Sequence, residues 1–273
     1  MYKINEVKIK TTLQKSKISE YCINPYLGCL NGCLYCYASF IMQRWHHKDE
    51  IWGSFADIRI NSVENLKKEI KNKDKIDVYI SSMTDAYQIV EEKYKLTREI
   101  LKTLSKEENA LFDKKFIITI QTKREVVLRD LDVLKNLKDI TVGFTITMLD
   151  EDKRKIFEKG ASETYKRLKA LEILNRNKIK TYAFFGPILP GISDDYEKIY
   201  EIVKSIYETG TKEILFDKLS YFKYMKRIKD ISYKLNLYND FLKSEDKNYL
   251  NELKSKILVV MDEFNNINYK ILF

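Results

Sequence analysis

The chain has 273 residues, 44% of them apolar, which is enough to form a buried core and excludes an intrinsically disordered protein. It carries no repeat of solenoid length, no low-complexity linker, no secretory signal and no transmembrane run, so we expect a cytoplasmic protein without a membrane partner. The net charge of +9, from 49 basic and 40 acidic residues, comes mostly from dispersed lysines. A Lys-rich composition explains this charge more simply than a nucleic-acid footprint, which stays the alternative.

Short β-rich runs alternate with amphipathic stretches along most of the chain. The predicted strands span residues 21–24, 77–81, 116–121, 141–147, 181–185 and 213–216. The helix expected after Asp194 has apolar residues at i, i+3, i+4 and i+7, which are Ile199, Ile202, Val203 and Ile206. A strand followed by a helix, repeated about six times, predicts an α/β fold of parallel strands with right-handed crossovers, short of the eight units of a closed barrel.

Three of the four cysteines lie directly after the first predicted strand. Cys29, Cys33 and Cys36 form the pattern C-x3-C-x2-C. A four-iron cluster normally takes four thiolates, so three leave one iron open to bind a substrate or cofactor directly. The spacing therefore predicts a 4Fe-4S cluster with one open site. We expect tight backbone turns at the neighbouring glycines, Gly28 and Gly32.

Zinc is the rival metal for this loop. Cys22, His46 or His47 could complete a tetrahedron, although structural zinc sites usually consist of two well separated pairs of ligands. A disulfide is less consistent with the reducing compartment that we expect. The two histidines could also be general acids, or have only a structural role.

The other polar motifs also follow predicted strands. Residues 82–85 follow the second strand, Lys123 the third and residues 187–191 the fifth, while residues 145–147 form the end of the fourth. All three prolines of the chain lie at such strand exits. Because the carboxyl ends of parallel strands meet on one rim, we expect these motifs to surround one site.

The run INPYLGCLNGCLYCYA, from Ile23 to Ala38, resembles the cluster loop of radical S-adenosylmethionine (radical SAM) enzymes, in the branch related to spore photoproduct lyase. The segment TDAYQ, from Thr84 to Gln88, resembles a second motif of that branch. Later matches follow in the same order as far as Leu219. They are Thr122-Lys123, Arg129-Asp130, Glu158, Arg167-Leu168 and the proline-rich segment 187–192.

The resemblance implies a partial (β/α)6 barrel and an enzyme of lyase or transferase type. It also implies a 4Fe-4S cluster that reductively cleaves S-adenosyl-L-methionine (AdoMet) and releases a 5'-deoxyadenosyl radical, which abstracts hydrogen from a substrate. A ferredoxin or flavodoxin would supply the electron. Kinship with spore photoproduct lyase favours a nucleic acid or nucleotide as the substrate.

The resemblance also implies roles for individual residues. Tyr35 would face the adenine of AdoMet, and Lys123 would pair with its carboxylate. Hydroxyls for the amino acid and ribose parts would come from Ser82, Thr84 and Thr145. Glu158 is a further cofactor-binding candidate, although an ion pair with Arg167 would explain it equally well. For each hydroxyl, capping of a strand end is the structural alternative, and for Tyr35 it is a place in the core.

The catalytic candidates are Cys22, Asp85 and Glu91. Spore photoproduct lyase uses the cysteine of a Cys-Thr-Ser-Asp stretch to return a hydrogen atom, and this chain has Ser82 at that position. A serine O–H bond is too strong for this step, so thymine-dimer repair is disfavoured. Cys22 is the remaining thiol, and it either quenches a radical, adds a ligand or belongs to the core.

Beyond residue 219 the motifs stop. We expect two parts, a barrel over residues 1–219 and a helical extension over 220–273 that closes or flanks it. In the extension, aromatic residues such as Phe222 and Tyr224 alternate with lysines, a pattern typical of an amphipathic helix and less often of a single-strand binding surface. The alternative function is a non-catalytic accessory protein that holds zinc or an iron-sulfur site as a structural element.

Overall fold

The computed structural model describes residues 2–45, 47–110, 114–220 and 222–273. Its main sheet has eight strands in the order β11-β10-β9-β8-β7-β6-β3-β2. Six of them form the predicted series, namely β3 (Tyr21–Ile23), β6 (Lys75–Ile80), β7 (Lys115–Thr122), β8 (Asp139–Thr145), β9 (Lys180–Ile188) and β10 (Glu213–Lys218). Neighbours in this series pair in parallel, as predicted. Only β2 (Gln14–Lys15) is antiparallel, on β3.

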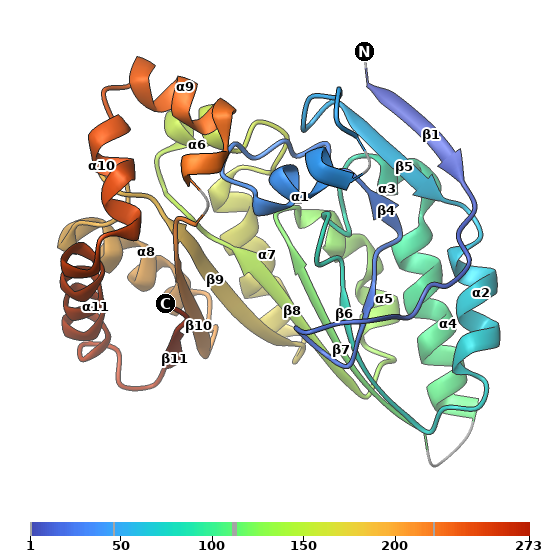
Figure 1. The fold of residues 1–273 in the computed structure, drawn as a ribbon. Coiled ribbons are helices and arrows are strands. Elements are labelled where there is room, and N and C mark those ends of the chain that lie inside the picture. Colours follow the sequence, from blue (N-terminus) through green and yellow to red (C-terminus); the bar gives the residue numbers. More distant parts are fainter. Residues whose placement is uncertain (1, 46, 111–113, 221) are drawn as a thin grey trace.

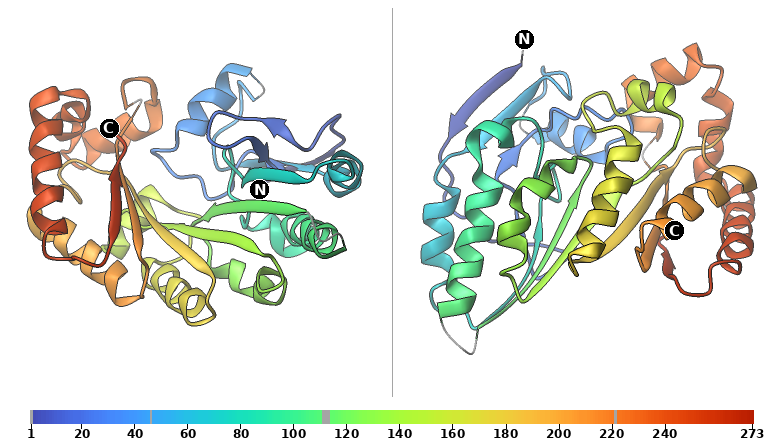
Figure 2. Two further views of the ribbon diagram at one scale, coloured as in Figure 1. Left: turned by 90° about the horizontal axis from the view of Figure 1, so that it is seen from below. Right: turned by 180° about the vertical axis from the view of Figure 1, so that it is seen from behind.

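The sheet is a partial barrel. Viewed as in the left panel of Figure 2, it curves into an arc, and the N-terminal and C-terminal parts of the chain stand at its two ends. In the described part of the chain, β2 and β11 form separate edges that do not pair, so the barrel stays open. This confirms the predicted α/β fold with a partial barrel.

Helices cover the convex side of the arc (Figures 1 and 2). They are α2 (Ser62–Ile70), α3 (Val90–Tyr94), α4 (Leu96–Ala110), α5 (Leu131–Leu134), α7 (Thr164–Arg176) and α8 (Tyr196–Glu208), with the 3-10 helix η1 (Glu125–Asp130). The strand side chains that face them are apolar, for example Val78, Ile118 and Val142, and form the main core with the buried helix faces. The predicted face of α8 is confirmed, because its four apolar residues are all buried.

A smaller sheet at the N-terminal end supports the cysteine loop. It has the order β1-β5-β4 and consists of β1 (Lys3–Val7), β5 (Phe55–Arg59) and β4 (Tyr26–Leu27). The loop continues from β4 into α1 (Tyr37–Trp45). Sequence patterns did not predict this sheet, since β4 has only two residues and β5 is almost wholly buried rather than alternating.

The C-terminal extension is mostly helical but ends in a strand. Its helices are η2 (Phe222–Tyr224), α9 (Lys226–Lys234), α10 (Tyr238–Leu242), η3 (Lys243–Glu245) and α11 (Lys247–Met261). Strand β11 (Asn268–Ile271) then adds a seventh parallel strand beside β10. The sequence analysis missed it because three of its four residues are exposed, which leaves no alternating pattern to detect.

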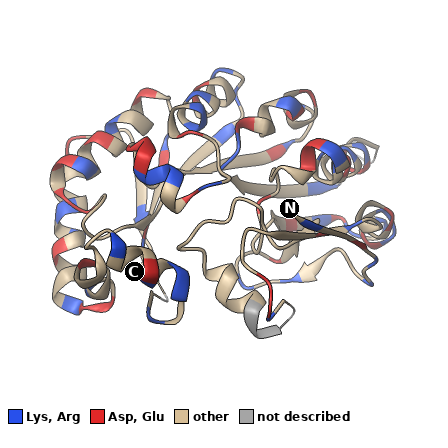
Figure 3. Cartoon of the chain, turned by 90° about the horizontal axis from the view of Figure 1, so that it is seen from above, with Lys and Arg blue, Asp and Glu red and all other residues tan. Residues whose placement is uncertain are grey.

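Charge is dispersed over the molecule. On the face shown in Figure 3, Lys and Arg lie among Asp and Glu and do not gather on one broad basic surface. No helix in the described ranges is both long and apolar enough to cross a bilayer.

Candidate cofactor and substrate site

A cavity of about 520 Å³ opens at the carboxyl ends of the parallel strands. Of the site residues predicted from sequence, it brings together Cys29, Cys33, Cys36, Ser82, Thr84, Asp85, Lys123 and Thr145. The predicted residues outside its lining are Cys22, Tyr35, Glu91 and Glu158. The motifs therefore converge on one rim, as expected for parallel strands.

The cysteine loop presents three unpaired thiols to this cavity. Cys29 and Cys33 are buried, and Cys36 is partly buried. Burial is the main cause that raises the pKa of all three thiols. The pKa of Cys33 is raised to about 12, although the positive charge of Lys123 works against this rise. Thiols in such a place become stable thiolates only beside a strong positive charge, so the donor set fits a metal cluster.

A cluster and a single metal ion place different demands on the sulfur atoms. Among the residues that the structure describes, no three His, Cys, Asp or Glu side chains are close enough to hold one metal ion. In a cubane each thiolate binds a different iron, so the three sulfurs need not meet at one point. His47, a rival zinc ligand, instead lies between Glu50 and Asp57. His46, the other histidine considered, lies outside the described residues.

Two residues of the TDAYQ segment form hydrogen bonds with the backbone of the cysteine loop. The Thr84 hydroxyl donates to the Gly28 carbonyl at 2.6 Å. The Gln88 amide donates to the same carbonyl at 3.1 Å, and its oxygen accepts from the Leu30 N–H at 2.9 Å. Gly28 has φ = +79°, and a Cβ there would lie 2.6 Å from the Phe55 ring, so only glycine fits. Gln88 thus fixes the backbone that leads into Cys29.

Asp85 connects three neighbouring segments. Its carboxylate accepts hydrogen bonds from the Asn31 amide (2.8 Å), the Thr122 hydroxyl (2.7 Å), the Lys123 N–H (2.8 Å) and the Tyr87 N–H (2.8 Å). All of its acceptor capacity near the cavity is therefore used. The contacts describe a positioning residue, and its proposed catalytic role stays a prediction.

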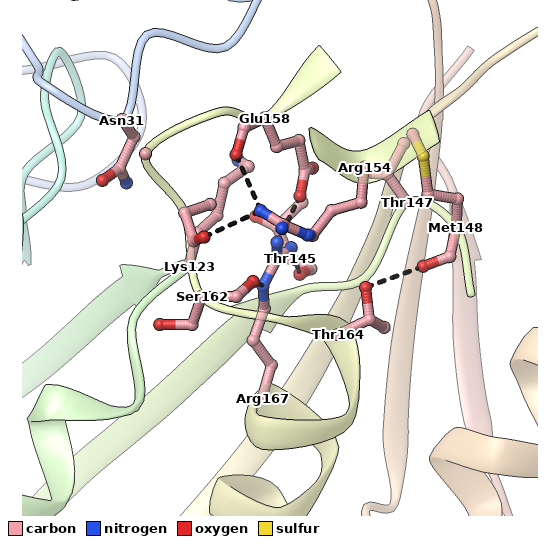
Figure 4. A network of polar contacts seen from close by, with 12 residues as sticks. Asn31, Lys123, Thr145, Thr147, Met148, Arg154, Glu158, Ser162, Thr164 and Arg167 are labelled. Carbon is pink, nitrogen blue, oxygen red and sulfur yellow. Dashed lines mark hydrogen bonds and ion pairs between the residues drawn. The ribbon is translucent and has the colours of Figure 1, made fainter. Parts of the chain in front are cut away.

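A buried ion pair lies next to the cysteine loop (Figure 4). Glu158 pairs with Arg167, and both side chains are almost fully buried. Arg167 also donates to the carbonyls of Thr145 (3.0 Å) and Ser162 (2.8 Å). Burial alone would raise the pKa of Glu158, but the positive charges of Arg167 and Lys123 lower it below its usual value. The structure therefore contains the ion pair between Glu158 and Arg167 that was the alternative role for Glu158.

Tyr35 belongs to the same network. Its hydroxyl donates to the Glu158 carboxylate, and its side chain is buried. Burial and the nearby negative charge of Glu158 raise the pKa of Tyr35 well above its usual value. With the hydroxyl held by Glu158, adenine could meet only the ring of Tyr35, and that contact stays a prediction.

Lys123 lines the same cavity as the three thiols. Its Nζ lies 5.6 Å from the centre of the Tyr35 ring, and no described residue forms a hydrogen bond with it. The opposing effects on its pKa are burial, which lowers it, and the negative charges of Cys33 and Glu158, which together raise it. A partly buried ammonium that lines a cavity and has no hydrogen-bond partner is well suited to bind an anionic ligand group.

Two catalytic candidates lie away from the cavity. The Cys22 thiol contacts the Ser16 hydroxyl at 3.1 Å, within β3. Glu91 lies on α3, pairs with Arg129 at 2.7 Å and accepts hydrogen bonds from Tyr26 and the Thr97 N–H. Burial raises the pKa of Glu91. These contacts are structural in kind, and a catalytic role for either residue stays a prediction.

The cavity is also lined by residues that sequence reasoning missed, namely Tyr79, Gln121, Tyr182 and Asp217. Gln121 accepts hydrogen bonds from the Tyr79 and Tyr182 hydroxyls, both at 2.9 Å, and donates to the Thr145 hydroxyl at 3.1 Å. Burial raises the pKa of Asp217, which stands where the β9–β10 register shifts opposite Gly186 and Pro187. The strand-end rule could have found Gln121 and Asp217, but the tyrosines lie within strands.

The C-terminal extension contributes to this site from two directions. Leu272, just after β11, lines the cavity. Phe222, Met225 and Phe241 pack in one cluster with Cys33 and Tyr35. The extension therefore shares a core with the cysteine loop.

Comparison with known proteins places these features in a family. A family model described as the radical SAM superfamily matches residues 23–203. An uncharacterized protein from Methanocaldococcus jannaschii, MJ0683, is 40% identical over 194 residues, which is 70% of each chain. The Mycobacterium tuberculosis protein Rv2578c is 23% identical over 220 residues, which is 76% of this chain and 62% of that protein.

Solved structures share the fold. A spore photoproduct lyase variant with bound AdoMet and dinucleoside spore photoproduct superposes with a TM-score of 0.74 at 14% identity, over 99% of this chain and 81% of that chain. Streptococcus suis SuiB bound to S-adenosylmethionine gives a TM-score of 0.62 at 15% identity, over 92% of this chain and 50% of that chain. The family match covers the cysteine loop and the parallel strands β6, β7, β8 and β9, so the chain belongs to the radical SAM superfamily of enzymes, which use an iron-sulfur cluster and AdoMet.

Proposed function

We propose that this protein binds a 4Fe-4S cluster through Cys29, Cys33 and Cys36 and uses it to cleave AdoMet. The observation that carries the proposal is that three free thiols, two of them buried, share one cavity with an ammonium that has no hydrogen-bond partner among the described residues. When bound, the cluster and AdoMet together supply a 5'-deoxyadenosyl radical that takes hydrogen from a substrate. We also propose a cytoplasmic location, since four free cysteines suit a reducing compartment.

The chain's own groups have separate tasks in this proposal. Lys123 pairs with the AdoMet carboxylate. The Asn31 amide oxygen, which is buried without a hydrogen-bond partner and whose residue lines the cavity, accepts from the AdoMet ammonium. Hydroxyls of Ser82 and Thr145 contact the ribose and amino acid parts. Thr84 and Glu158 act through the loop, because Thr84 donates to Gly28 and Glu158 holds Tyr35.

The substrate would bind in the part of the cavity that is lined by Gln121, Tyr182 and Asp217. A nucleic acid or nucleotide is the favoured class, because a structurally similar lyase binds a dinucleoside. Thymine-dimer repair stays disfavoured, since Ser82, which lines the cavity, takes the place of the lyase's cysteine in the sequence motif. Polar amide and carboxylate groups together with aromatic rings suit the edge and face of a nucleobase.

The test is anaerobic purification followed by reconstitution with iron and sulfide. We expect a brown protein that, with dithionite and AdoMet, forms 5'-deoxyadenosine detectable by liquid chromatography. Addition of AdoMet is expected to change the electron paramagnetic resonance spectrum of the reduced cluster. A colourless zinc protein that forms no 5'-deoxyadenosine would support the accessory-protein alternative instead.

Lys123→Met is expected to weaken AdoMet binding about tenfold, because the carboxylate loses its cation inside a buried site. Lys123→Arg, which keeps the positive charge, should lose less. Both are measured by isothermal titration of AdoMet into reconstituted protein, with iron content as the control for cluster loading. Equal AdoMet affinity of Lys123→Met and the unmodified protein would refute this role.

A further inference from the structure

The cysteine loop is reached by a second cleft, outside the main cavity. This cleft measures about 40 Å³ and lies between α1 and the start of α9. Its lining includes Cys33, Phe40, Trp52, Tyr224, Lys226 and Arg227. Cys33 and Trp52 also line the main cavity, so one proposed cluster ligand borders both openings.

The rim of this cleft is positively charged and aromatic. We call Tyr224, Lys226 and Arg227 the α9 edge. Tyr224 is 66% exposed, while its neighbours Phe222 and Met225 are buried beneath it. Arg227 is held in place because its guanidinium donates to the Trp52 carbonyl.

Acidic side chains do not pair with the positive charges of the α9 edge in the described part of the chain. Lys223, next to it, pairs with Glu245 at 2.8 Å. In the part of the chain that the structure describes, no carboxylate forms an ion pair with Lys226 or Arg227. Exposed positive charge beside an exposed aromatic ring is a combination found at protein interfaces.

We propose that the α9 edge is the docking surface for an acidic one-electron carrier protein that reduces the cluster. The inference rests on the proposed function, since it assumes a cluster on Cys33. In this step the carrier loses one electron and the cluster gains it, and no bond is formed or broken. Because electron transfer slows steeply with distance, the carrier must dock where a cluster ligand comes close to the surface.

Other routes to the cluster are occupied. The main cavity is assigned to AdoMet and substrate, and Cys29 is packed in a buried cluster with Ala38, Met42, Trp52 and Phe55. A small charged contact is also typical of redox encounters, which bury little area and depend on steering by charge. An acidic carrier would complement the unpaired cations of the α9 edge.

A single-stranded nucleic acid is the other macromolecule that such a surface could bind. The carrier is favoured because the charged edge is short and borders a cluster ligand. A strand that tracks a backbone would need a longer line of cations, and on the face shown in Figure 3 cations are interspersed with acids.

The test compares two electron donors on the reconstituted full chain. Lys226→Glu reverses one charge of the α9 edge and leaves the Arg227 contact with Trp52 in place. Lys106→Glu makes the same change at an exposed lysine on α4, away from the cysteine loop. The rate of 5'-deoxyadenosine formation is measured with reduced flavodoxin and, separately, with dithionite. Flavodoxin binding is measured by isothermal titration.

We expect Lys226→Glu to lower the flavodoxin-dependent rate and flavodoxin affinity about fivefold, with the dithionite-dependent rate unchanged. Lys106→Glu should match the unmodified protein with both donors. Raising the salt concentration from about 50 to about 300 mM should also weaken flavodoxin binding to the unmodified protein. Tyr224→Ala provides a second variant, expected to weaken flavodoxin binding without altering the dithionite rate.

The proposal is overturned if Lys226→Glu lowers the rate of 5'-deoxyadenosine formation equally with flavodoxin and with dithionite. It is overturned as well if Lys226→Glu gives the same rates and flavodoxin affinity as Lys106→Glu. It is also overturned if Lys226→Glu weakens binding of a fluorescent single-stranded oligonucleotide while flavodoxin binding is unaffected. Failure of the proposed function is distinguishable from these results. In that case the unmodified protein would form no 5'-deoxyadenosine even with dithionite.

Discussion

Replacing Cys33 with alanine is expected to abolish both the iron-sulfur cluster and AdoMet cleavage. Each of the three thiolates would hold one iron, and removal of one leaves a second open corner in a cavity that admits AdoMet. Outer partners of a metal site typically change affinity by about 10 to 100-fold, so loss of a direct ligand should exceed that range. Iron and sulfide content, visible absorbance and 5'-deoxyadenosine formation are the measurements.

Cys22→Ala is the matched control, because it removes the remaining cysteine of the chain. Its thiol contacts Ser16 and lies outside the cavity lining, so we expect full iron content and unchanged turnover. Loss of turnover in Cys22→Ala, with the cluster intact, would instead support a radical-quenching role. If Cys33→Ala retained a full cluster, the assignment of the cluster ligands would be wrong.

The second large effect is expected from Glu158→Ala. This change leaves the Arg167 guanidinium buried without its carboxylate partner, and Tyr35 without its acceptor. Breaking a buried pair from one side typically lowers the free energy of unfolding by about 3 to 5 kcal/mol. Urea unfolding of the purified protein measures the change.

Glu163→Ala is the control for that measurement. Glu163 pairs with Lys166 at 2.9 Å, but both side chains are more than a third exposed. An exposed pair of this kind contributes little to the free energy of unfolding, because solvent screens the two charges. Similar losses in the two variants would show that burial of the Glu158 pair does not matter.

The pH dependence of unfolding gives a further check on Glu158. Its pKa is lower in the folded protein than its usual value of 4.5. The stabilisation from its charged form is therefore complete above about pH 4.5 and is lost as the pH falls through the lower folded value. As the pH falls from about 5 to about 3, the unmodified protein should therefore lose more stability than Glu158→Gln does.

Much of the site was predictable because the relevant signals are local. The spacing of the cysteines, the alternation of strands and helices, and the position of polar motifs after strands are all visible in the sequence. A parallel sheet places every carboxyl end of a strand on the same rim. For this reason Lys123 and Ser82, far apart in the chain, line the same cavity.

Other contacts could not be predicted because they depend on which neighbours fold against a side chain. Tyr35 lies between two cysteines in sequence, yet its hydroxyl is bound by Glu158, 123 residues later. Glu91 follows the TDAYQ motif closely, yet α3 turns it toward Arg129 and away from the cavity. Sequence proximity to a motif does not fix the direction of a side chain.

The sequence by itself determined the family, the class of fold and the identity of the three thiols, because these follow from short-range spacing and from the periodicity of apolar residues. Only the tertiary structure decided the second sheet, the β11 edge strand, the brace from Gln88 and the cleft beside α9. These features arise from long-range packing, in which a residue's partners are set by the whole arrangement of the chain and leave no periodic trace in the sequence around it.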